Sequence, residues 1–198
     1  MIKLLIFDVG GVIVDYKEED YMGYISKKLG LDVRKFAKAM NPLIVKLEYG
    51  DIKTGDVESA LSRQFNTPER DLELVGAFKK LAKLDTKVAR LMARLSKRYR
   101  IVLLSNISAI RYLEAKRLFL DKVKHGRTFA SCYLRMRKPE RRIYLYVLKA
   151  MRTRPEDAIF IDNTQENVEG ARKAGITSIR FISCGQLTKA LGGYGVRP

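Results

Sequence analysis

The sequence is poor in the residues that build disulfide frameworks, zinc sites and histidine-dependent catalytic sites. Its 198 residues include two cysteines, Cys132 and Cys184, and a single histidine, His125. Two widely separated cysteines make no disulfide framework and do not have the spacing of zinc ligands. His125 stands in a polar stretch that is typical of a surface loop. A metal site in this chain should therefore bind a hard ion through oxygen ligands.

Long apolar segments are also lacking. No run approaches the ~18 apolar residues that span a bilayer, and the chain opens on a strand-like pattern containing Asp8, which is unlike a signal peptide. We therefore expect a cytoplasmic protein with no membrane partner. The hydrophobic fraction of 46% is enough for one globular core with a modest insertion.

Acidic residues are scarce relative to basic ones. The chain has 22 Asp and Glu against 39 Lys and Arg, which gives a net charge of +17. Residues 1–60 hold nearly equal numbers of both signs, so the excess lies in the later part of the chain. Such a basic portion fits a polyanionic partner such as nucleic acid, or a phosphorylated substrate. A general bias toward solvated Lys and Arg explains it equally well.

The opening stretch predicts a buried strand followed by a tight turn. An apolar run over residues 2–7 leads directly into Asp8, and Gly10 and Gly11 follow. Such a run is typical of the central strand of a parallel sheet, and the two glycines allow the backbone to turn sharply. Asp8 would then stand at the carboxyl end of the strand, where ligands bind in open α/β sheets. A solvated aspartate before a glycine turn is the simpler alternative.

Residues 16–80 predict helices only. The patterns favour helices over residues 18–29, 33–40, 42–50 and 54–65, with another that begins at Thr67. A break is expected at Asn41-Pro42, because the pair supplies an N-cap and a proline for the first helical turn. This segment therefore predicts an all-helical insertion between the first strand and the rest of the chain.

From residue 81 onward, predicted strands and helices alternate. The strands cover residues 99–104, 128–133, 158–161 and 176–182, and the helices between them cover 109–120, 139–151 and 165–174. A helix from about residue 86 precedes these elements, and a short helix ends the chain. Alternation of this kind predicts an α/β fold with a Rossmann-like parallel sheet flanked by helices. The core would comprise residues 1–15 and 81–198, and the helical insertion residues 16–80.

Further polar residues follow the predicted strands or precede a helix. Ser105-Asn106 closes one strand, Asp162-Asn163 closes another, and Lys138 precedes a proline at the start of a helix. Each alone is an ordinary cap, turn or solvated residue. Parallel strands, however, bring their carboxyl ends to one edge of the sheet. The set therefore predicts one pocket that contains two carboxylates, a hydroxyl group and an ammonium group.

These residues resemble the four motifs of the haloacid dehalogenase-like (HAD) hydrolases, and the resemblance covers nearly the whole chain. In family order they are residues 7–12 (FDVGGV), 104–106 (LSN), 137–140 (RKPE) and 161–163 (IDN). The helical insertion is similar to the small helical (C1) cap of the family. Residues 47–52 (LEYGDI) and 136–140 (MRKPE) also resemble the branch that includes sugar-1-phosphatases and the phosphatase domain of soluble epoxide hydrolases.

The resemblance implies a Mg²⁺-dependent phosphomonoester hydrolase that acts on a small phosphorylated metabolite, with a sugar phosphate as one candidate. Asp8 would be the nucleophile and form an aspartyl-phosphate intermediate. Asp8, the Gly10 carbonyl and Asp162 would hold Mg²⁺ together with waters. Ser105 and Lys138 would bind the phosphoryl oxygens and stabilise charge in the transition state.

Four further residues have implied positions around this centre. Gly11 and Asn106 would contribute to phosphate binding, whereas Asn163 and Asn167 would support the site from behind it. Substrate choice would depend on the cap, for which the sequence gives no specific residues. The oligomeric state is equally open.

Two departures from the family pattern affect the expected chemistry. Gly10 stands where the phosphatases usually have a second aspartate as general acid and base, a group worth typically ~10²–10⁴ in rate. We therefore expect a leaving group that needs little protonation, such as an anomeric sugar phosphate or an aryl phosphate. Arg135 stands where the branch usually has glycine, which would reshape the loop before Lys138.

Two alternative functions remain at this stage. A metal-independent haloacid dehalogenase also uses an aspartate nucleophile without the second aspartate, although this chain keeps an acid at Asp162. A catalytically weak protein of the same fold that binds polyanions or nucleic acid would explain a basic stripe at helical spacing, formed by Lys83, Lys87, Arg90, Arg94 and Lys97 or Arg98.

Overall fold

The computed structural model describes residues 1–198 and places the opening strand at the centre of a five-stranded sheet. All neighbouring strands are parallel, in the order β5-β4-β1-β6-β7. Their bounds are Leu4–Phe7 (β1), Arg100–Ser105 (β4), Thr128–Ala130 (β5), Ala158–Asp162 (β6) and Thr177–Arg180 (β7). The predicted α/β fold with a Rossmann-like parallel sheet is therefore confirmed.

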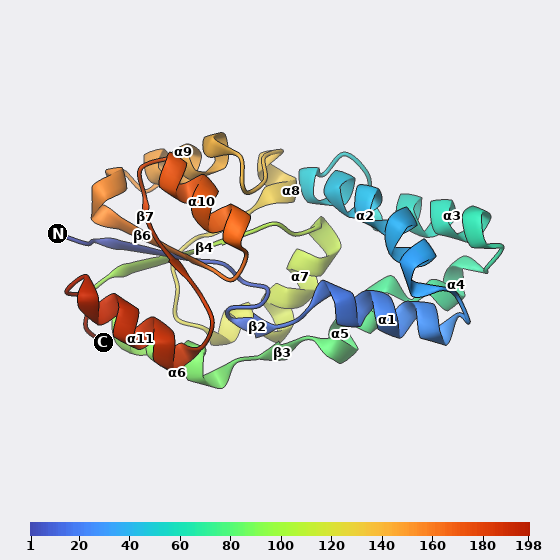
Figure 1. Cartoon of the computed structure of the whole chain (residues 1–198), viewed down its shortest axis with the longest axis horizontal. Helices are drawn as coiled ribbons and strands as arrows, with labels where there is room; N and C mark the ends of the chain where they lie inside the picture. Colours follow the sequence, from blue (N-terminus) through green and yellow to red (C-terminus); the bar gives the residue numbers. More distant parts are fainter.

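Alternate side chains of β1 build the two faces of the core. Leu4 and Ile6 pack in the cluster beneath α9 (Arg141–Ala150) and α10 (Gln165–Lys173), which lie on one side of the sheet (Figure 1). Leu5 and Phe7 belong to the cluster that includes α6 (Thr86–Leu95) and α11 (Cys184–Gly193) on the other side. All four side chains are fully buried. A central strand with helices on both faces needs this unbroken apolar run.

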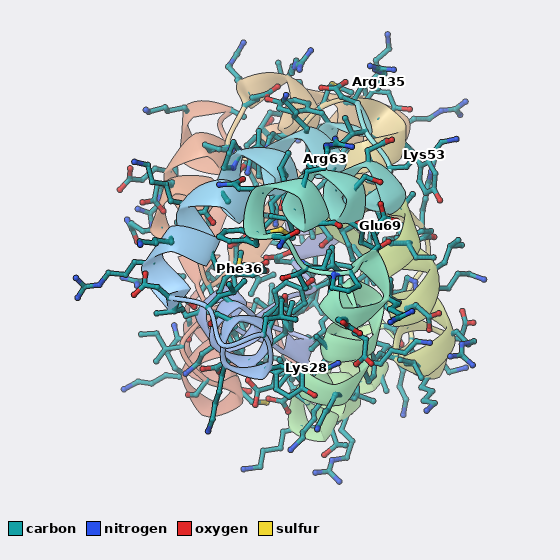
Figure 2. All side chains as sticks on the ribbon, turned by 90° about the vertical axis from the view of Figure 1, so that its right-hand side faces the viewer. Lys28, Phe36, Lys53, Arg63, Glu69 and Arg135 are labelled. Atoms are coloured by element: carbon teal, nitrogen blue, oxygen red, sulfur yellow. The ribbon has the colours of Figure 1, made fainter.

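Five helices form a separate layer at one end of the molecule, beyond the carboxyl ends of the strands (Figure 1). They are α1 (Glu18–Lys28), α2 (Val33–Tyr49), α3 (Thr54–Phe65), α4 (Glu69–Leu72) and α5 (Leu74–Leu81). We call this layer the cap. Figure 2, in which the cap faces the viewer, shows Phe36 among the cap helices. Phe36 is fully buried, so the cap has its own apolar interior.

The chain enters and leaves the cap through a small antiparallel pair of strands. Val14–Asp15 (β2) pairs with Lys83–Leu84 (β3), directly before α1 and after α5. Two-residue strands are too short to be predicted from a sequence pattern. The pairing holds the segment that leads into the cap next to the segment that leads out of it.

The helix α2 differs from the prediction, which placed a break at Asn41-Pro42. The structure has one continuous helix from Val33 to Tyr49 with Pro42 inside it. Phe36, Met40 and Leu47 all lie on its buried face, and Pro42 is exposed. Burial of this continuous apolar face compensates for the hydrogen bond that proline cannot donate.

The segment after β5 also differs from the prediction. The expected strand over residues 128–133 ends at Ala130, and a single helical turn, α8 (Ser131–Leu134), follows. The helix α7 (Ala109–Leu118) and short 3₁₀ turns at Leu120–Lys122 and Pro155–Asp157 complete the core. His125 lies in a loop, as expected, where its ring contacts Val123 O and Thr128 Oγ1.

The basic stripe of α6 lies on the solvent side of the molecule. Lys87, Arg90 and Arg94 are exposed, and none of them forms an ion pair. Binding of a polyanion to this face stays a prediction. None of the helices combines the length and the apolar composition that crossing a bilayer requires.

Close packing between α10 and the loop before α9 gives a stability test. A Cβ added at Gly170 would lie 2.5 Å from the carbonyl oxygen of Pro139, whereas one added at Gly23 in α1 meets nothing within 4 Å. Alanine favours a helix over glycine by ~1 kcal/mol, so Gly23→Ala should slightly stabilise the protein. Gly170→Ala should destabilise it by about 1–3 kcal/mol because backbone must shift. Urea unfolding measures both, and equal effects would contradict the packing described here.

Candidate active site

The register of the sheet places Asp8 and Asp162 side by side. Phe7 pairs with Ile161, so the next residues, Asp8 and Asp162, stand level on neighbouring strands. The backbone is held there by a hydrogen bond from Asp8 N–H to Ile161 O of 2.8 Å. On the other side of β1, Ser105 ends β4 one residue further along. The carboxyl ends of three strands therefore meet at the centre of one edge of the sheet.

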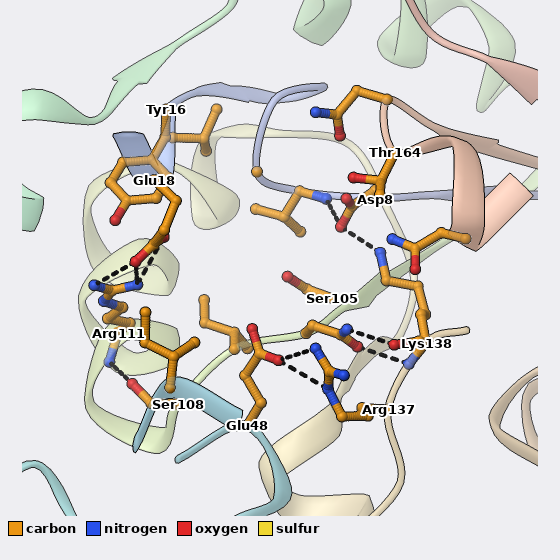
Figure 3. A pocket seen from close by; sticks show the side chains of 18 of the residues that line it. Asp8, Tyr16, Glu18, Glu48, Ser105, Ser108, Arg111, Arg137, Lys138 and Thr164 are labelled. Atoms are coloured by element: carbon orange, nitrogen blue, oxygen red, sulfur yellow. Dashed lines mark hydrogen bonds and ion pairs between the residues drawn. The ribbon is translucent and has the colours of Figure 1, made fainter. Parts of the chain in front are cut away.

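Lys138 lies between the two carboxylates. Its Nζ is 2.8 Å from Asp8 Oδ1 and 2.6 Å from Asp162 Oδ2, and the contact with Asp8 is visible in Figure 3. All three residues are buried, with Lys138 only 1% exposed. Buried charges of this kind are stable only when they are paired. We call Asp8, Lys138 and Asp162 the charged triad.

Burial and mutual repulsion change the pKa values within the triad. Burial and the charge of Asp162 raise the pKa of Asp8 to about 7, although Lys138 and the Val9 N–H act in the opposite direction. Burial alone would lower the pKa of Lys138, but the two carboxylates outweigh it and raise that pKa. The ammonium group therefore stays charged, and the Asp8 carboxyl group is about half ionised at neutral pH. A cation bound to Asp8 would favour the anion at lower pH.

Amide side chains hold the triad in place. Asn106 accepts the Lys138 N–H at 2.8 Å and donates to the Lys138 carbonyl at 2.9 Å. Asn167 donates to both oxygens of Asp162 at 3.1 and 3.2 Å. Asn106, expected at the phosphate, thus uses its amide on the backbone of Lys138, and its contact with phosphate stays a prediction. Asn167 lies next to Asp162 and also lines the cavity, and its supporting role in the reaction stays a prediction.

The remaining predicted site residues fall into two groups. Ser105 is 5% exposed, and its hydroxyl group points into the cavity beside Asp8 (Figure 3). Gly10 also lines this cavity, but Gly11 lines a separate hollow on the other side of the turn. Gly11 has a φ of 74° and packs against Asn163, so a side chain there would collide with Asn163. Its position therefore reflects the shape of the turn.

A cavity of about 480 Å³ extends from the triad to the cap. Two ion pairs cross it from cap to core: Glu18 with Arg111 of α7 at 3.3 Å, and Glu48 with Arg137 at 2.7 Å. Figure 3 shows the first pair on the side of the cavity away from Lys138 and the second below Ser105. The sequence predicts no role for these four residues. Their pairing depends on how the cap is placed, which no local pattern reveals.

The oxygen atoms around Asp8 fit a hard divalent cation. Both contacts of the Asp8 side chain involve Oδ1, so Oδ2 has no partner in a residue that lines the cavity. The Gly10 carbonyl accepts none of the backbone hydrogen bonds of the turn, and the buried Asn163 Oδ1 has no partner. No group of three or more acidic, histidine or cysteine side chains is arranged so that it could hold a metal ion. An ion here would therefore take most ligands from a carboxylate, a carbonyl group and water, as Mg²⁺ does.

Asp162 fits this ion less directly. Its two oxygens already accept hydrogen bonds from the Thr164 N–H, Asn167 and Lys138, and its side chain is fully buried. The bonds from Asn167 are the longest of these and would be the easiest to exchange. Direct ligation by Asp162 stays a prediction.

Comparison with known proteins agrees with this arrangement. A family model of the haloacid dehalogenase-like hydrolases matches residues 2–175. The chain belongs to this family. A solved magnesium and inorganic phosphate complex of a HAD family enzyme from Bacteroides thetaiotaomicron superposes with a TM-score of 0.77, at 21% identity. The superposition covers 91% of this chain and 94% of that chain.

Two fungal proteins are similar in sequence to this hydrolase. A sesquiterpene phosphatase of Aspergillus oryzae is 24% identical over 198 residues, which cover 96% of this chain and 97% of that protein. A drimenol cyclase of Aspergillus calidoustus is 25% identical over 186 residues, covering 91% of this chain. The match spans only 34% of the cyclase, so this hydrolase corresponds to about a third of that protein.

The charged triad predicts an unusual pH dependence for a Lys138→Met variant. Without the ammonium group, Asp8 and Asp162 repel each other in a buried site, and we expect a loss of about 3–5 kcal/mol. The pKa of Asp8, already raised by burial, rises further above its unfolded value, so the deficit should be largest at pH 8 and shrink toward pH 5 as Asp8 binds a proton. Urea unfolding at both pH values measures it. The exposed Lys87→Met is the control, and a deficit independent of pH would refute the explanation.

Proposed function

We propose that this hydrolase cleaves phosphate monoesters in a Mg²⁺-dependent reaction through an aspartyl-phosphate on Asp8. The observation that carries the proposal is the geometry of the Asp8 carboxylate. One of its oxygens is held by the Val9 N–H at 2.6 Å and by Lys138 at 2.8 Å. The other oxygen accepts no hydrogen bond, and Asp8 lines the cavity. A fixed anionic oxygen beside a buried ammonium group suits nucleophilic attack on an anionic phosphoryl group.

The residues of this chain would divide the work as follows. Asp8 Oδ2 attacks phosphorus, and the bond from phosphorus to the leaving oxygen breaks. Lys138 and the Ser105 hydroxyl group stabilise negative charge on the phosphoryl oxygens, since both lie at the edge of the cavity next to Asp8. Water then attacks phosphorus and releases phosphate, which returns Asp8 to its carboxylate form.

Asp8, the Gly10 carbonyl and Asp162 would hold Mg²⁺, and the unpartnered Asn163 Oδ1 would be available to a metal-bound water. The ion would reduce the repulsion between the Asp8 carboxylate and a phosphate dianion. Support comes from the fit of the oxygen atoms described above. The Bacteroides enzyme, of the same fold, is described as a complex with magnesium and phosphate.

The leaving group would occupy the part of the cavity beneath the cap. Its wall there includes apolar side chains from both layers, namely Tyr16, Ile44, Leu47, Phe78 and Ile107. A phosphorylated metabolite with a hydrocarbon portion fits this wall, and the similarity to a sesquiterpene phosphatase supports such a substrate. A sugar phosphate would instead use the polar groups of Glu18 and Arg111, which line the same cavity.

The first test replaces the nucleophile. Asp8→Asn should abolish hydrolysis across a panel of aryl, sugar and prenyl phosphates, because an amide oxygen is a poor nucleophile. Asp15→Asn makes the same charge change at an exposed residue seven positions later and should leave the rate unchanged. Released phosphate is measured with and without Mg²⁺.

The same panel separates the proposal from the dehalogenase alternative. Release of halide from 2-haloacids without added metal, together with no release of phosphate, would reject the phosphatase. Activity of Asp8→Asn equal to that of the wild type would reject the aspartyl-phosphate.

A second test addresses Gly10, where the family usually has a general acid and base. A Cβ added at Gly10 meets nothing within 4 Å, and the residue lines the cavity, so an aspartate fits there. Gly10→Asp should raise kcat for alkyl phosphates, whose leaving groups need a proton, by up to ~10². Aryl phosphates should change little. Gly10→Asn has the same shape without the acid, and an equal gain from both variants would contradict the role of proton transfer.

A further inference from the structure

The loop that carries Lys138 is attached to the cap along most of its length. We call residues 135–140 the lysine loop. Asp51 pairs with Arg135 at 2.7 Å, Glu48 pairs with Arg137, and the Tyr49 hydroxyl group donates to Glu140. These cap residues belong to the end of α2 and the residues just after it. Figure 2 shows Arg135 at the rim of the cap.

Gly50 completes this contact between the two backbones. It has a φ of 72°, and a Cβ there would lie 2.3 Å from the carbonyl oxygen of Cys132. No residue with a side chain allows this approach, so the end of α2 rests directly on the segment before the lysine loop. Four consecutive cap residues, 48–51, therefore touch the core between residues 132 and 140.

The pair of Glu48 and Arg137 is the best buried of these contacts. Arg137 donates from Nε at 3.0 Å and from Nη2 at 2.7 Å, both to Glu48 Oε2. The side chains are 15% and 26% exposed, in contrast to 46% and 70% for Asp51 and Arg135. A two-point contact from a guanidinium group fixes direction as well as distance. Arg137 is also the immediate chain neighbour of Lys138.

We infer that Glu48 and Arg137 are positioning residues that hold the Lys138 ammonium group between Asp8 and Asp162. Asn106 fixes the backbone of Lys138 from the core, and the Glu48–Arg137 pair fixes the preceding residue from the cap. The lysine loop is thereby held from two sides. The position of the Lys138 ammonium group therefore depends on the contact between the cap and the lysine loop. The phosphate site is complete only while the cap makes this contact.

The kinetic test of this inference rests on the proposed function, whereas a second test, chemical labelling of Lys138, does not depend on activity. Lys138 is 1% exposed, so acetic anhydride should label it far more slowly than the surface lysines. In Glu48→Gln and in Arg137→Gln, labelling of Lys138 should become severalfold faster, as measured by mass spectrometry of its peptide. This measurement reads the position of the lysine whether or not the protein hydrolyses phosphate esters.

A cap-to-core ion pair remote from the lysine loop provides the matched control. Lys79 of α5 pairs with Glu114 of α7 at 3.3 Å, and neither residue lines the cavity. Glu114→Gln removes one cap-to-core contact without touching Lys138, so labelling and turnover should stay as in the wild type. Equal acceleration of labelling by Glu114→Gln would overturn the inference, because general loosening of the cap would then explain it.

The kinetic test uses the best phosphate ester of the panel. We expect Glu48→Gln and Arg137→Gln each to lower kcat by about ten- to a hundredfold through displacement of Lys138, with KM changed less than threefold. The kcat of the double variant should be no lower than that of the slower single variant, because both substitutions remove the same contact. Arg137→Lys, which keeps the charge but not the two-point contact, should fall between.

Two further results would overturn the inference. If kcat falls while Lys138 stays protected from acetic anhydride, the pair acts on the substrate and not through the lysine. If Lys138 stays protected in both single variants, the cap does not hold it, whatever the rates. A wild type that is inactive on every ester would reject the proposed function alone, since the labelling result still decides this inference.

Discussion

The interaction on which the site depends is the buried contact of one ammonium group with two carboxylates. Asp8 and Asp162 are brought level by the register of β1 and β6, and neither carboxylate is exposed enough for water to neutralise the repulsion. Lys138 supplies the missing charge at 2.6 and 2.8 Å. Because a buried charge without a partner costs several kcal/mol, the fold is most stable when the lysine loop is held where this contact forms.

This requirement explains the extent of the support around Lys138. An amide from the end of β4 holds its backbone, and the end of α2 holds the residue before it. The support on the cap side comes from residues 89 positions earlier in the chain. The left-handed backbone of Arg135, with a φ of 52°, fits this picture. The family branch usually has glycine there, and the pair with Asp51 stabilises a conformation that is unfavourable for arginine.

The sequence sufficed to predict residues whose position follows from a strand end. Asp8, Ser105 and Asp162 end or directly follow parallel strands, so their convergence follows from the topology. The partners of Arg137 and Arg111 could not be predicted, because they depend on how the cap sits on the core. The continuity of α2 through Pro42 was missed for a related reason, since its buried face forms only in tertiary contact. The contact of Gly11 with phosphate, which the family resemblance implies, stays a prediction, because a tight turn alone also favours glycine at this position.

The electrostatics of the molecule act at two ranges. Within the triad the formal charge is −1 when all three groups are ionised, and the Glu18–Arg111 and Glu48–Arg137 pairs add no net charge to the cavity. A bound divalent cation would make the centre positive, which a phosphate dianion requires. The net charge of +17 is carried largely by exposed side chains and can only attract anions over about a Debye length, ~8 Å at physiological salt. The exposed basic residues thus attract an anionic substrate, whereas the charged triad acts in its reaction. Substitution of surface charges therefore need not affect the triad.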